Sequence, residues 1–201
     1  MSYSSLPIME HFNTLQGEGN YSGAAAYFIR LALCDVGCVW CDVKESWEIK
    51  ENQYLDYQQI AQYLGDFLGE IVVVTGGEPT LHDLSRLTLL IHQLGKRSHI
   101  ETAGTNALTG DWDWVTLSPK KFKACLPENF TKANELKVVI FHPSDFEWAE
   151  ELAAKVSKDC LLYLQPEWSK RDKNSQLIVE YIKKNPKWRL SVQSHKFVNI
   201  P

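Results

Sequence analysis

Residues 27–41, YFIRLALCDVGCVWC, join an apolar run to three closely spaced cysteines. The apolar run predicts a β-strand over residues 27–33. The cysteines Cys34, Cys38 and Cys41 are three of only five in the chain. Thiolates bind soft metals and iron–sulfur clusters. A structural zinc site or an ordinary cluster takes four protein ligands, so three cysteines leave one metal position open to a ligand that is not protein.

The composition is that of a globular protein. The chain has 201 residues, 44% hydrophobic and 23% charged, with a formal net charge of −4. We expect a single domain over residues 1–201 and no nucleic acid as the main ligand. The sequence predicts no membrane span and no secretory segment. Clustered cysteines in odd number favour metal binding in a reducing, cytoplasmic compartment over disulfides.

Strand-like and helical segments alternate along the chain. The periodicity predicts strands at residues 27–33, 71–75, 99–102, 114–117, 136–141, 161–165 and 189–192, and helices at 57–67, 84–94, 144–156 and 176–184. This alternation indicates an α/β fold with a mostly parallel sheet. A complete eight-unit barrel typically takes about 250 residues, so we expect a shortened, open (β/α) partial barrel. Such folds carry their chemistry at the C-terminal ends of the strands.

Arg30 lies inside the first apolar strand. Because side chains alternate between faces in a strand, Phe28, Arg30, Ala32 and Cys34 are predicted to share one face. A guanidinium in an apolar strand needs an anion, and its forked donors suit a carboxylate. The alternative is an arginine on an edge strand that points to solvent.

Polar or glycine-rich segments follow four of the predicted strands. Gly76-Gly77-Glu78-Pro79 follows the strand at 71–75, and its glycines allow close approach of a ligand to the backbone. Read alone, this is also an ordinary strand–turn–helix junction. The segments 101–105, 118–120 and 165–167 follow three further strands, and turn chemistry alone would explain each of them.

The cysteine spacing and the Gly-Gly-Glu-Pro run together resemble the radical S-adenosylmethionine (SAM) superfamily. In that superfamily the open iron of a [4Fe–4S] cluster chelates the amino and carboxylate groups of SAM, and Gly-Gly-Glu-Pro receives the amino group. Two alternatives remain for the cysteines. One is a zinc knot with a fourth ligand from His11, Asp42 or a distant residue, and the other is a redox Cys-x-x-Cys pair.

Two further segments resemble one family within that superfamily, 7-carboxy-7-deazaguanine synthase. Residues 12–19, FNTLQGEG, resemble its Gln-Gly-Glu-Gly signature, and residues 193–201, QSHKFVNIP, resemble its ending. Without the resemblance, the first segment would be a structural turn and the second a frayed tail. The matching blocks are scattered from Phe12 to Pro201.

The resemblance implies a carbon–nitrogen lyase that converts 6-carboxy-5,6,7,8-tetrahydropterin to 7-carboxy-7-deazaguanine in queuosine and 7-deazapurine biosynthesis. A radical derived from SAM would take hydrogen from C6 of the pterin, the ring would contract with loss of ammonia, and SAM would be regenerated. The implied cofactors are a [4Fe–4S] cluster and SAM. The implied partners are an electron donor such as flavodoxin or ferredoxin and a second copy of the chain in a homodimer.

The resemblance also assigns site residues. Cys34, Cys38 and Cys41 would hold the cluster. The cofactor-binding set would be Trp40, Asp42, Gly76, Gly77, Glu78, Ser118, Pro119, Lys120 and Gln165. The substrate-binding set would be Leu15, Gln16, Gly17, Arg30, Thr75, His195 and Pro201, the last through its carboxylate. Arg30 and Glu18 are our candidates for catalytic residues, with Arg30 paired to the substrate carboxylate.

One position departs from the family pattern. The family usually has a hydroxyl residue directly after Cys-Asp, where it ligates a Mg²⁺ ion that bridges to the substrate. This chain has Val43 there, and magnesium demands oxygen ligands. Water or Ser46 would have to replace the hydroxyl, so the sequence leaves the magnesium requirement open. Ala103, where the family often has asparagine, is a milder change.

Two other functions compete with this one. A small activase that installs a glycyl radical on a large partner would share the cysteines and the Gly-Gly-Glu-Pro run, but it would not need residues 16–19 or Pro201. A zinc-binding interaction module without enzymatic activity would explain the cysteines alone and leave the segments at the strand ends without a role.

Overall fold

A nine-stranded sheet forms the frame of the protein in the computed structural model, which describes residues 5–201. The strand order is β3-β1-β2-β4-β5-β6-β7-β8-β9. The strands are β1 (Ser5–Leu15), β2 (Ala25–Leu31), β3 (Tyr54–Asp56), β4 (Ile71–Gly76), β5 (Arg97–Thr102), β6 (Trp114–Leu117), β7 (Glu135–Ile140), β8 (Leu161–Pro166) and β9 (Trp188–Leu190). The helices are α1 (Tyr57–Asp66), α2 (Ser85–Gln93), α3 (Pro127–Phe130), α4 (Asp145–Ala153), α5 (Arg171–Lys184) and α6 (Ser194–Val198).

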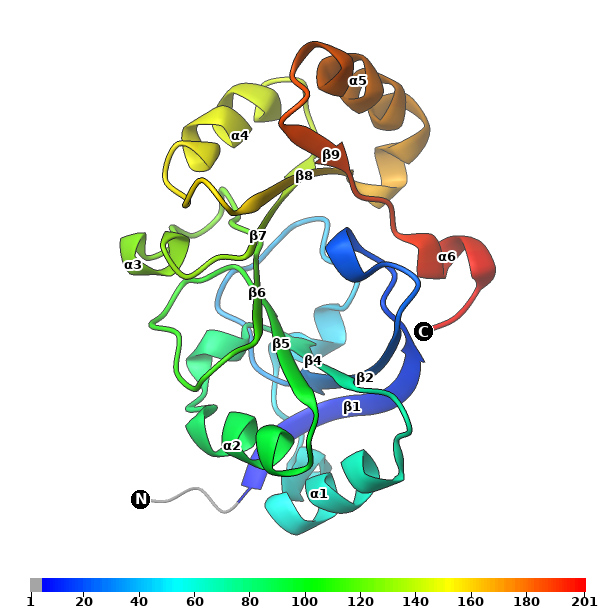
Figure 1. The fold of residues 1–201 in the computed structure, drawn as a ribbon, viewed down its shortest axis with the longest axis vertical. Helices are drawn as coiled ribbons and strands as arrows, with labels where there is room; N and C mark the ends of the chain where they lie inside the picture. Colours follow the sequence, from blue (N-terminus) through cyan, green and yellow to red (C-terminus); the bar gives the residue numbers. More distant parts are fainter. Residues whose placement is uncertain (1–4) are drawn as a thin grey trace.

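The sheet is strongly curved but open. Strands β2 and β4 to β9 run parallel, whereas β1 pairs antiparallel with both β2 and β3. Figure 1 shows α1, α2, α4 and α5 on the outer side of the curve, while the segment after β1 and helix α6 lie on the inner side. The prediction of an α/β fold with a shortened, open barrel is therefore confirmed, and the inner side is free to hold a site.

Two apolar clusters attach the helices to the sheet. The first packs α1 and α2 against β1, β2 and β4, around fully buried residues such as Leu31, Leu64 and Val74. The second packs α4 and α5 against β6 to β8, around Leu136 and Ile178. Burial of such side chains contributes roughly 1.5–3 kcal/mol each, so these clusters fix the outer wall of the curved sheet.

Every predicted strand and helix exists, with bounds that shift by a few residues. The largest shift is in α5, which begins at Arg171 rather than Gln176. The predicted strand 27–33 ends at Leu31, because Leu33 adopts a φ of 84°. Of the four residues predicted to share one face, Phe28, Arg30 and Cys34 line the cavity on the inner side of the sheet, and Ala32 is fully buried.

The structure also contains elements that the sequence did not predict. Among them are β1, β3, the short helices α3 and α6 and several single-turn 3₁₀ helices. Strand β1 covers the free edge of β2 and supplies the residues that lead into the segment 16–19. Among residues 5–201, the structure contains no helix with the length and apolar character that a membrane crossing requires.

Candidate active site

A cavity of about 790 Å³ opens on the inner side of the sheet, at the C-terminal ends of the parallel strands. Its lining comes from segments that are far apart in the sequence. The predicted site residues that line it are Leu15, Gln16, Gly17, Glu18, Arg30, Cys34, Cys38, Trp40, Cys41, Asp42, Thr75, Gly76, Gly77, Glu78, Ser118, Lys120, Gln165, His195 and Pro201. Pro119, between Ser118 and Lys120, is buried and is not one of the described residues that line the cavity.

The three predicted cluster ligands sit together on the loop after β2. The loop is tied down by hydrogen bonds from Leu33 N to Ser46 O (2.7 Å) and from Cys34 N to Trp47 O (3.3 Å). Cys34, Cys38 and Cys41 are free thiols that pack around Val36 and Ala103. Burial raises the pKa of the Cys34 thiol, and it raises that of Cys38 to about 11. A metal would have to displace these protons, because thiolates are the ligating form.

The donor set fits an iron–sulfur cluster. Among residues 5–201, no three histidine, cysteine or acidic side chains converge as ligands of a single metal ion. In a cubane cluster each cysteine binds a different iron, so the thiols need to surround the group rather than converge on one point. His11 bonds through Nδ1 to the Tyr27 hydroxyl at 2.6 Å and does not join the cysteines among the cavity-lining residues that the structure describes.

Gly76 and Gly77 are glycines because two backbones pass very close to each other there. A Cβ on Gly76, which has a φ of +144°, would lie 2.3 Å from Leu31 O, and one on Gly77 would lie 2.0 Å from Leu33 O. Gly77 N and Glu78 N donate to those same two carbonyls at 2.9 and 2.8 Å. This close contact binds the end of β4 to the cysteine loop, which the sequence alone did not predict.

Glu78 uses its carboxylate inside the protein. The side chain is 1% exposed. It accepts hydrogen bonds from Thr80 N (3.0 Å), Thr80 Oγ1 (2.7 Å) and Ala103 N (2.8 Å), and a further one from Thr102 Oγ1. The carboxylate of Glu78 therefore fastens the turn after β4 to the end of β5, at the edge of the cavity.

Lys120 and Gln165 reach the cavity from neighbouring strand ends. Lys120 Nζ donates to the backbone carbonyl and to Oγ of Ser118. Burial lowers the pKa of this ammonium, against an opposing effect of Cys38. Gln165 Oε1 accepts from Ser191 Oγ at 2.8 Å, and the side chain lines the cavity.

The segment 16–19 is packed against the C-terminal part of the chain. A Cβ on Gly17 would lie 2.0 Å from Nδ1 of His195, so the imidazole rests directly on this glycine. Gln16 Nε2 donates to Glu101 Oε1 at 2.8 Å, and Gln193 Nε2 donates to Glu18 Oε1 at 2.9 Å. The predicted substrate residues of both chain regions therefore form one wall.

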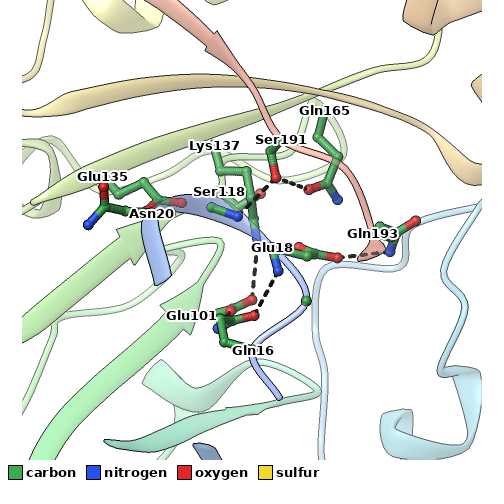
Figure 2. A network of polar contacts seen from close by, with 12 residues as sticks. Gln16, Glu18, Asn20, Glu101, Ser118, Glu135, Lys137, Gln165, Ser191 and Gln193 are labelled. Atoms are coloured by element: carbon green, nitrogen blue, oxygen red, sulfur yellow. Dashed lines mark hydrogen bonds and ion pairs between the residues drawn. The ribbon is translucent and has the colours of Figure 1, made fainter. Parts of the chain in front are cut away.

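A buried ionic network lies behind that wall (Figure 2). Lys137 Nζ pairs with Glu18 Oε2 and, at 3.1 Å, with Glu101 Oε2. Glu135 lies next to the network and accepts from Asn20 N at 3.0 Å. The sequence analysis did not single out Lys137 or Glu135. The signal was present, since Lys137 lies inside the apolar strand 136–141 and Glu135 directly before it, and buried ionisable residues need partners.

Arg30 points into the cavity with part of its guanidinium free. Its Nε donates to Glu10 Oε1 at 2.6 Å, and its side chain is 18% exposed. Within residues 5–201 the two Nη groups have no hydrogen-bond partner. The carboxylate that the structure places on Arg30 is that of Glu10, and the pairing of the Nη groups with a substrate carboxylate stays a prediction.

The C-terminal residues close one side of the cavity. Thr14 Oγ1 donates to Pro201 O at 3.2 Å, and Lys196 Nζ pairs with Asp42 Oδ2 at 2.5 Å. Helix α6 is short, and it is held by bonds from Ser194 N and Ser194 Oγ to Gly17 O. These tertiary contacts order a tail that sequence patterns treat as frayed.

The residues at positions 43 and 46 do not supply the hydroxyl ligand of the family pattern. Val43 lines the cavity with an apolar side chain. Ser46 is 1% exposed, and its hydroxyl donates to Val43 O at 2.7 Å. Asp42, the nearest carboxylate in sequence, is paired with Lys196. Neither Val43 nor Ser46 therefore presents a free oxygen ligand, whereas Asp42 keeps Oδ1 unpaired among the described residues.

Known proteins resemble this chain along nearly its whole length. Residues 29–119 match the Radical SAM superfamily. The 7-carboxy-7-deazaguanine synthase of Flavobacterium psychrophilum is 49% identical over 98% of this chain and 93% of its own, and that of Escherichia coli K12 is 38% identical over 96% and 98%. The crystal structure of QueE from Escherichia coli aligns with a TM-score of 0.87 at 35% identity, covering 96% of each chain.

The open α/β sheet, the cysteine loop and the cavity at the strand ends define a radical SAM enzyme, and such enzymes carry a [4Fe–4S] cluster and SAM. Within that superfamily the chain belongs to the 7-carboxy-7-deazaguanine synthase family of lyases. The resemblance drawn from its motifs is thereby confirmed.

Proposed function

We propose that this chain converts 6-carboxy-5,6,7,8-tetrahydropterin to 7-carboxy-7-deazaguanine, with ring contraction and loss of ammonia, in queuosine and 7-deazapurine biosynthesis. The observation that carries the proposal is the composition of one cavity. Segments around residues 16–18, 30, 34–42, 75–78 and 193–201 all line it, and they come from both ends and the middle of the chain. An activase has no use for the residues of the two chain ends at this place.

The pterin end of the cavity is assigned to Gln16, Gly17, Glu18, Arg30, Thr75, His195 and Pro201, with Leu15 at its edge. The free Nη groups of Arg30 pair with the substrate carboxylate, because a bidentate charge-assisted pair gives both energy and orientation. Glu18 is held as a carboxylate, which accepts N–H groups of the pterin ring. Burial raises its pKa, but the neighbouring Lys137 outweighs burial and lowers the pKa to about 2.

The other end of the cavity is assigned to the cofactors. When bound, the cluster and SAM supply the radical that removes hydrogen from C6 of the pterin. Cys34, Cys38 and Cys41 hold the cluster. Trp40, Asp42, Gly76, Gly77, Ser118, Lys120 and Gln165 surround SAM, while Glu78 and Pro119 support that wall from inside. The backbone of Leu31 and Leu33 lies so close to Gly76 and Gly77 that neither position has room for a side chain. The backbone at these glycines therefore stays open to the cofactor.

The proposal extends to the setting of the enzyme. Residues 1–201 work as one radical SAM domain, as a homodimer in the cytoplasm, and the substrate is a small molecule rather than nucleic acid or membrane lipid. A flavodoxin or ferredoxin supplies the electrons. The reaction does not depend on a magnesium ion held at position 43, because Val43 has no oxygen to offer and the Ser46 hydroxyl is bonded to Val43 O.

An anaerobic reaction followed by mass spectrometry tests the function. Reduced, cluster-loaded protein receives SAM and 6-carboxytetrahydropterin, with and without Mg²⁺. We expect 7-carboxy-7-deazaguanine in both samples, at similar rates. Product that forms only with Mg²⁺ would contradict the statement about position 43. 5′-Deoxyadenosine without 7-carboxy-7-deazaguanine would show that the substrate is wrong, and deleting Pro201 without effect would favour an activase.

A further inference from the structure

Lys137 is a charged side chain buried in the wall of the cavity, between two carboxylates. Its ammonium pairs with Glu18 Oε2 and with Glu101 Oε2, and its side chain is only 5% exposed. Glu18 comes from the loop after β1, Glu101 from β5 and Lys137 from β7 (Figure 2). One ammonium therefore joins three separate parts of the fold.

The two carboxylates keep acceptor capacity toward the cavity. Glu18 Oε1 accepts one bond from Gln193 Nε2, and Glu101 Oε1 accepts one from Gln16 Nε2. Each remaining oxygen takes the bond from Lys137. A carboxylate oxygen accepts about two hydrogen bonds, and both side chains line the cavity. The pair is therefore only partly satisfied by the protein and has lone pairs left for a ligand.

The charge of this pair depends on Lys137. Glu135 adds a third carboxylate behind the pair, and the other groups that act on the network are Lys120 from the loop after β6 and His195 from α6. Burial alone would lower the pKa of Lys137, but Glu101, Glu18 and Glu135 raise it far above its ordinary value. Without that cation, two buried carboxylates would stand side by side, and one of them would take up a proton.

We propose that Lys137 is a positioning residue of the pterin site: it keeps Glu18 and Glu101 ionised and fixed side by side, so that both accept N–H groups of the substrate ring. The inference rests on the proposed function, since the pterin supplies several N–H donors on its ring and amino nitrogens. An ionised carboxylate is an acceptor only, whereas a protonated one presents an O–H donor. Protonation of either carboxylate would place its O–H donor opposite an N–H donor of the substrate ring.

The test is the pH dependence of substrate binding in charge variants of the cluster-loaded, SAM-bound enzyme. Lys137→Met removes the charge, Lys137→Gln removes it but keeps an N–H donor, and Lys137→Arg keeps it. The dissociation constant of 6-carboxytetrahydropterin is measured anaerobically by equilibrium dialysis between pH 6.5 and 8.5. Circular dichroism establishes whether each variant is folded. If Lys137→Met does not fold, the comparison is made with Lys137→Gln alone.

Loss of the cation removes the charge that lowers the pKa of Glu18, so weakened binding should recover as the pH rises and Glu18 ionises again. We expect the wild type and Lys137→Arg to be nearly independent of pH in this range. The Met and Gln variants should bind about tenfold more weakly at pH 6.5 and recover most of that loss at pH 8.5. A loss of the same factor at every pH would mean that Lys137 only fills space, and wild-type affinity in the neutral variants would also overturn the proposal. If the wild type does not bind the pterin, the proposed function itself fails.

Discussion

The imidazole of His195 lies directly on the Cα of Gly17, so that a Cβ at position 17 would come within 2.0 Å of Nδ1. The same two segments are joined by hydrogen bonds from Ser194 N and Ser194 Oγ to Gly17 O, at 2.9 and 3.0 Å. The contact connects residues near the two ends of the sequence and forms one wall of the cavity. Burial lowers the pKa of His195, so the imidazole is neutral at pH 7.

A larger side chain at Gly17 should displace the cavity wall that Gly17 and His195 form together. Gly17→Ala would push His195 and helix α6 away, and we expect the KM for the pterin to rise about tenfold with little change in cluster content. Gly65→Ala is the matched control, because a Cβ there meets no atom within 4 Å among the described residues. Steady-state kinetics and iron analysis of both variants check this. An unchanged KM in Gly17→Ala would contradict the assigned wall.

Arg30 should discriminate between carboxylated and uncarboxylated pterins. Loss of a charge-assisted bond costs about 2 kcal/mol, or a factor of about thirty in affinity. We therefore expect Arg30→Gln to weaken binding of 6-carboxytetrahydropterin by about thirtyfold and to leave binding of tetrahydropterin unchanged. Isothermal titration calorimetry of both ligands measures the difference.

The control for Arg30→Gln is Arg86→Gln. In the wild type, the Arg86 guanidinium stacks on Tyr57 on the outer face, 4.2 Å from the ring centroid. This variant should bind both pterins like the wild type. Equal weakening of both ligands by Arg30→Gln would show that Arg30 supports the cavity through Glu10 rather than binding a carboxylate.

The parallel strands and long helices could be predicted because each carries a strong periodic pattern. Residues 71–75 are a continuous apolar run, and Asp56 with Gln59 forms a capping box that starts α1 at the predicted residue. Strand β1 was missed because it contains Pro7 and because Glu10, His11 and Asn13 interrupt its apolar pattern. Residues 5–15 form a strand because they pair with β2 and β3. This pairing depends on the tertiary structure and is not contained in the local sequence.

The site was predictable in its motifs but not in its supporting contacts. The cysteine loop, residues 76–79 and residues 16–19 are local patterns, and the cavity brings them together. The pairing of Lys137 with Glu18 and Glu101 joins residues 119 and 36 positions apart, so no local pattern contains it. Helix α6 has only five residues, too few for periodicity to indicate it.

Glu78 should contribute strongly to the stability of the fold, because its buried carboxylate accepts several hydrogen bonds. In Glu78→Gln an amide NH₂ would face donors that now point at a carboxylate oxygen, which leaves buried N–H groups unpaired. Such a loss costs about 3 kcal/mol. Urea unfolding followed by tryptophan fluorescence measures this, and Glu70→Gln, at an exposed position, should cost less than about 0.5 kcal/mol. Equal stability of the two variants would contradict the structural role of Glu78.

His99 should make the protein less stable in mild acid. Burial, assisted by Arg97, lowers the pKa of His99 from 6.5 to about 4, and Nε2 has no hydrogen-bond partner among the described residues. Below pH 6.5 the unfolded chain binds a proton that the folded protein does not, so the free energy of unfolding falls as the pH drops from 6.5 to 4. The full effect is about 3 kcal/mol.

The measurement for His99 is the difference in unfolding free energy between wild type and His99→Gln as a function of pH. Other titrating groups cancel in this difference. We expect the advantage of the wild type to shrink by about 3 kcal/mol between pH 7 and pH 4. A difference that is constant with pH would mean that the pKa of His99 is the same in the folded and unfolded states.

The central claim is that this enzyme takes hydrogen from C6 of the pterin, and a deuterium label at C6 tests it most directly. The label should pass to the 5′ carbon of the deoxyadenosyl group and, because its methyl hydrogens are equivalent by rotation, should partly remain in recovered SAM. Mass spectrometry should find 7-carboxy-7-deazaguanine together with SAM heavier by one mass unit. Formation of 5′-deoxyadenosine without deuterium, on a protein with an intact cluster, would contradict the account.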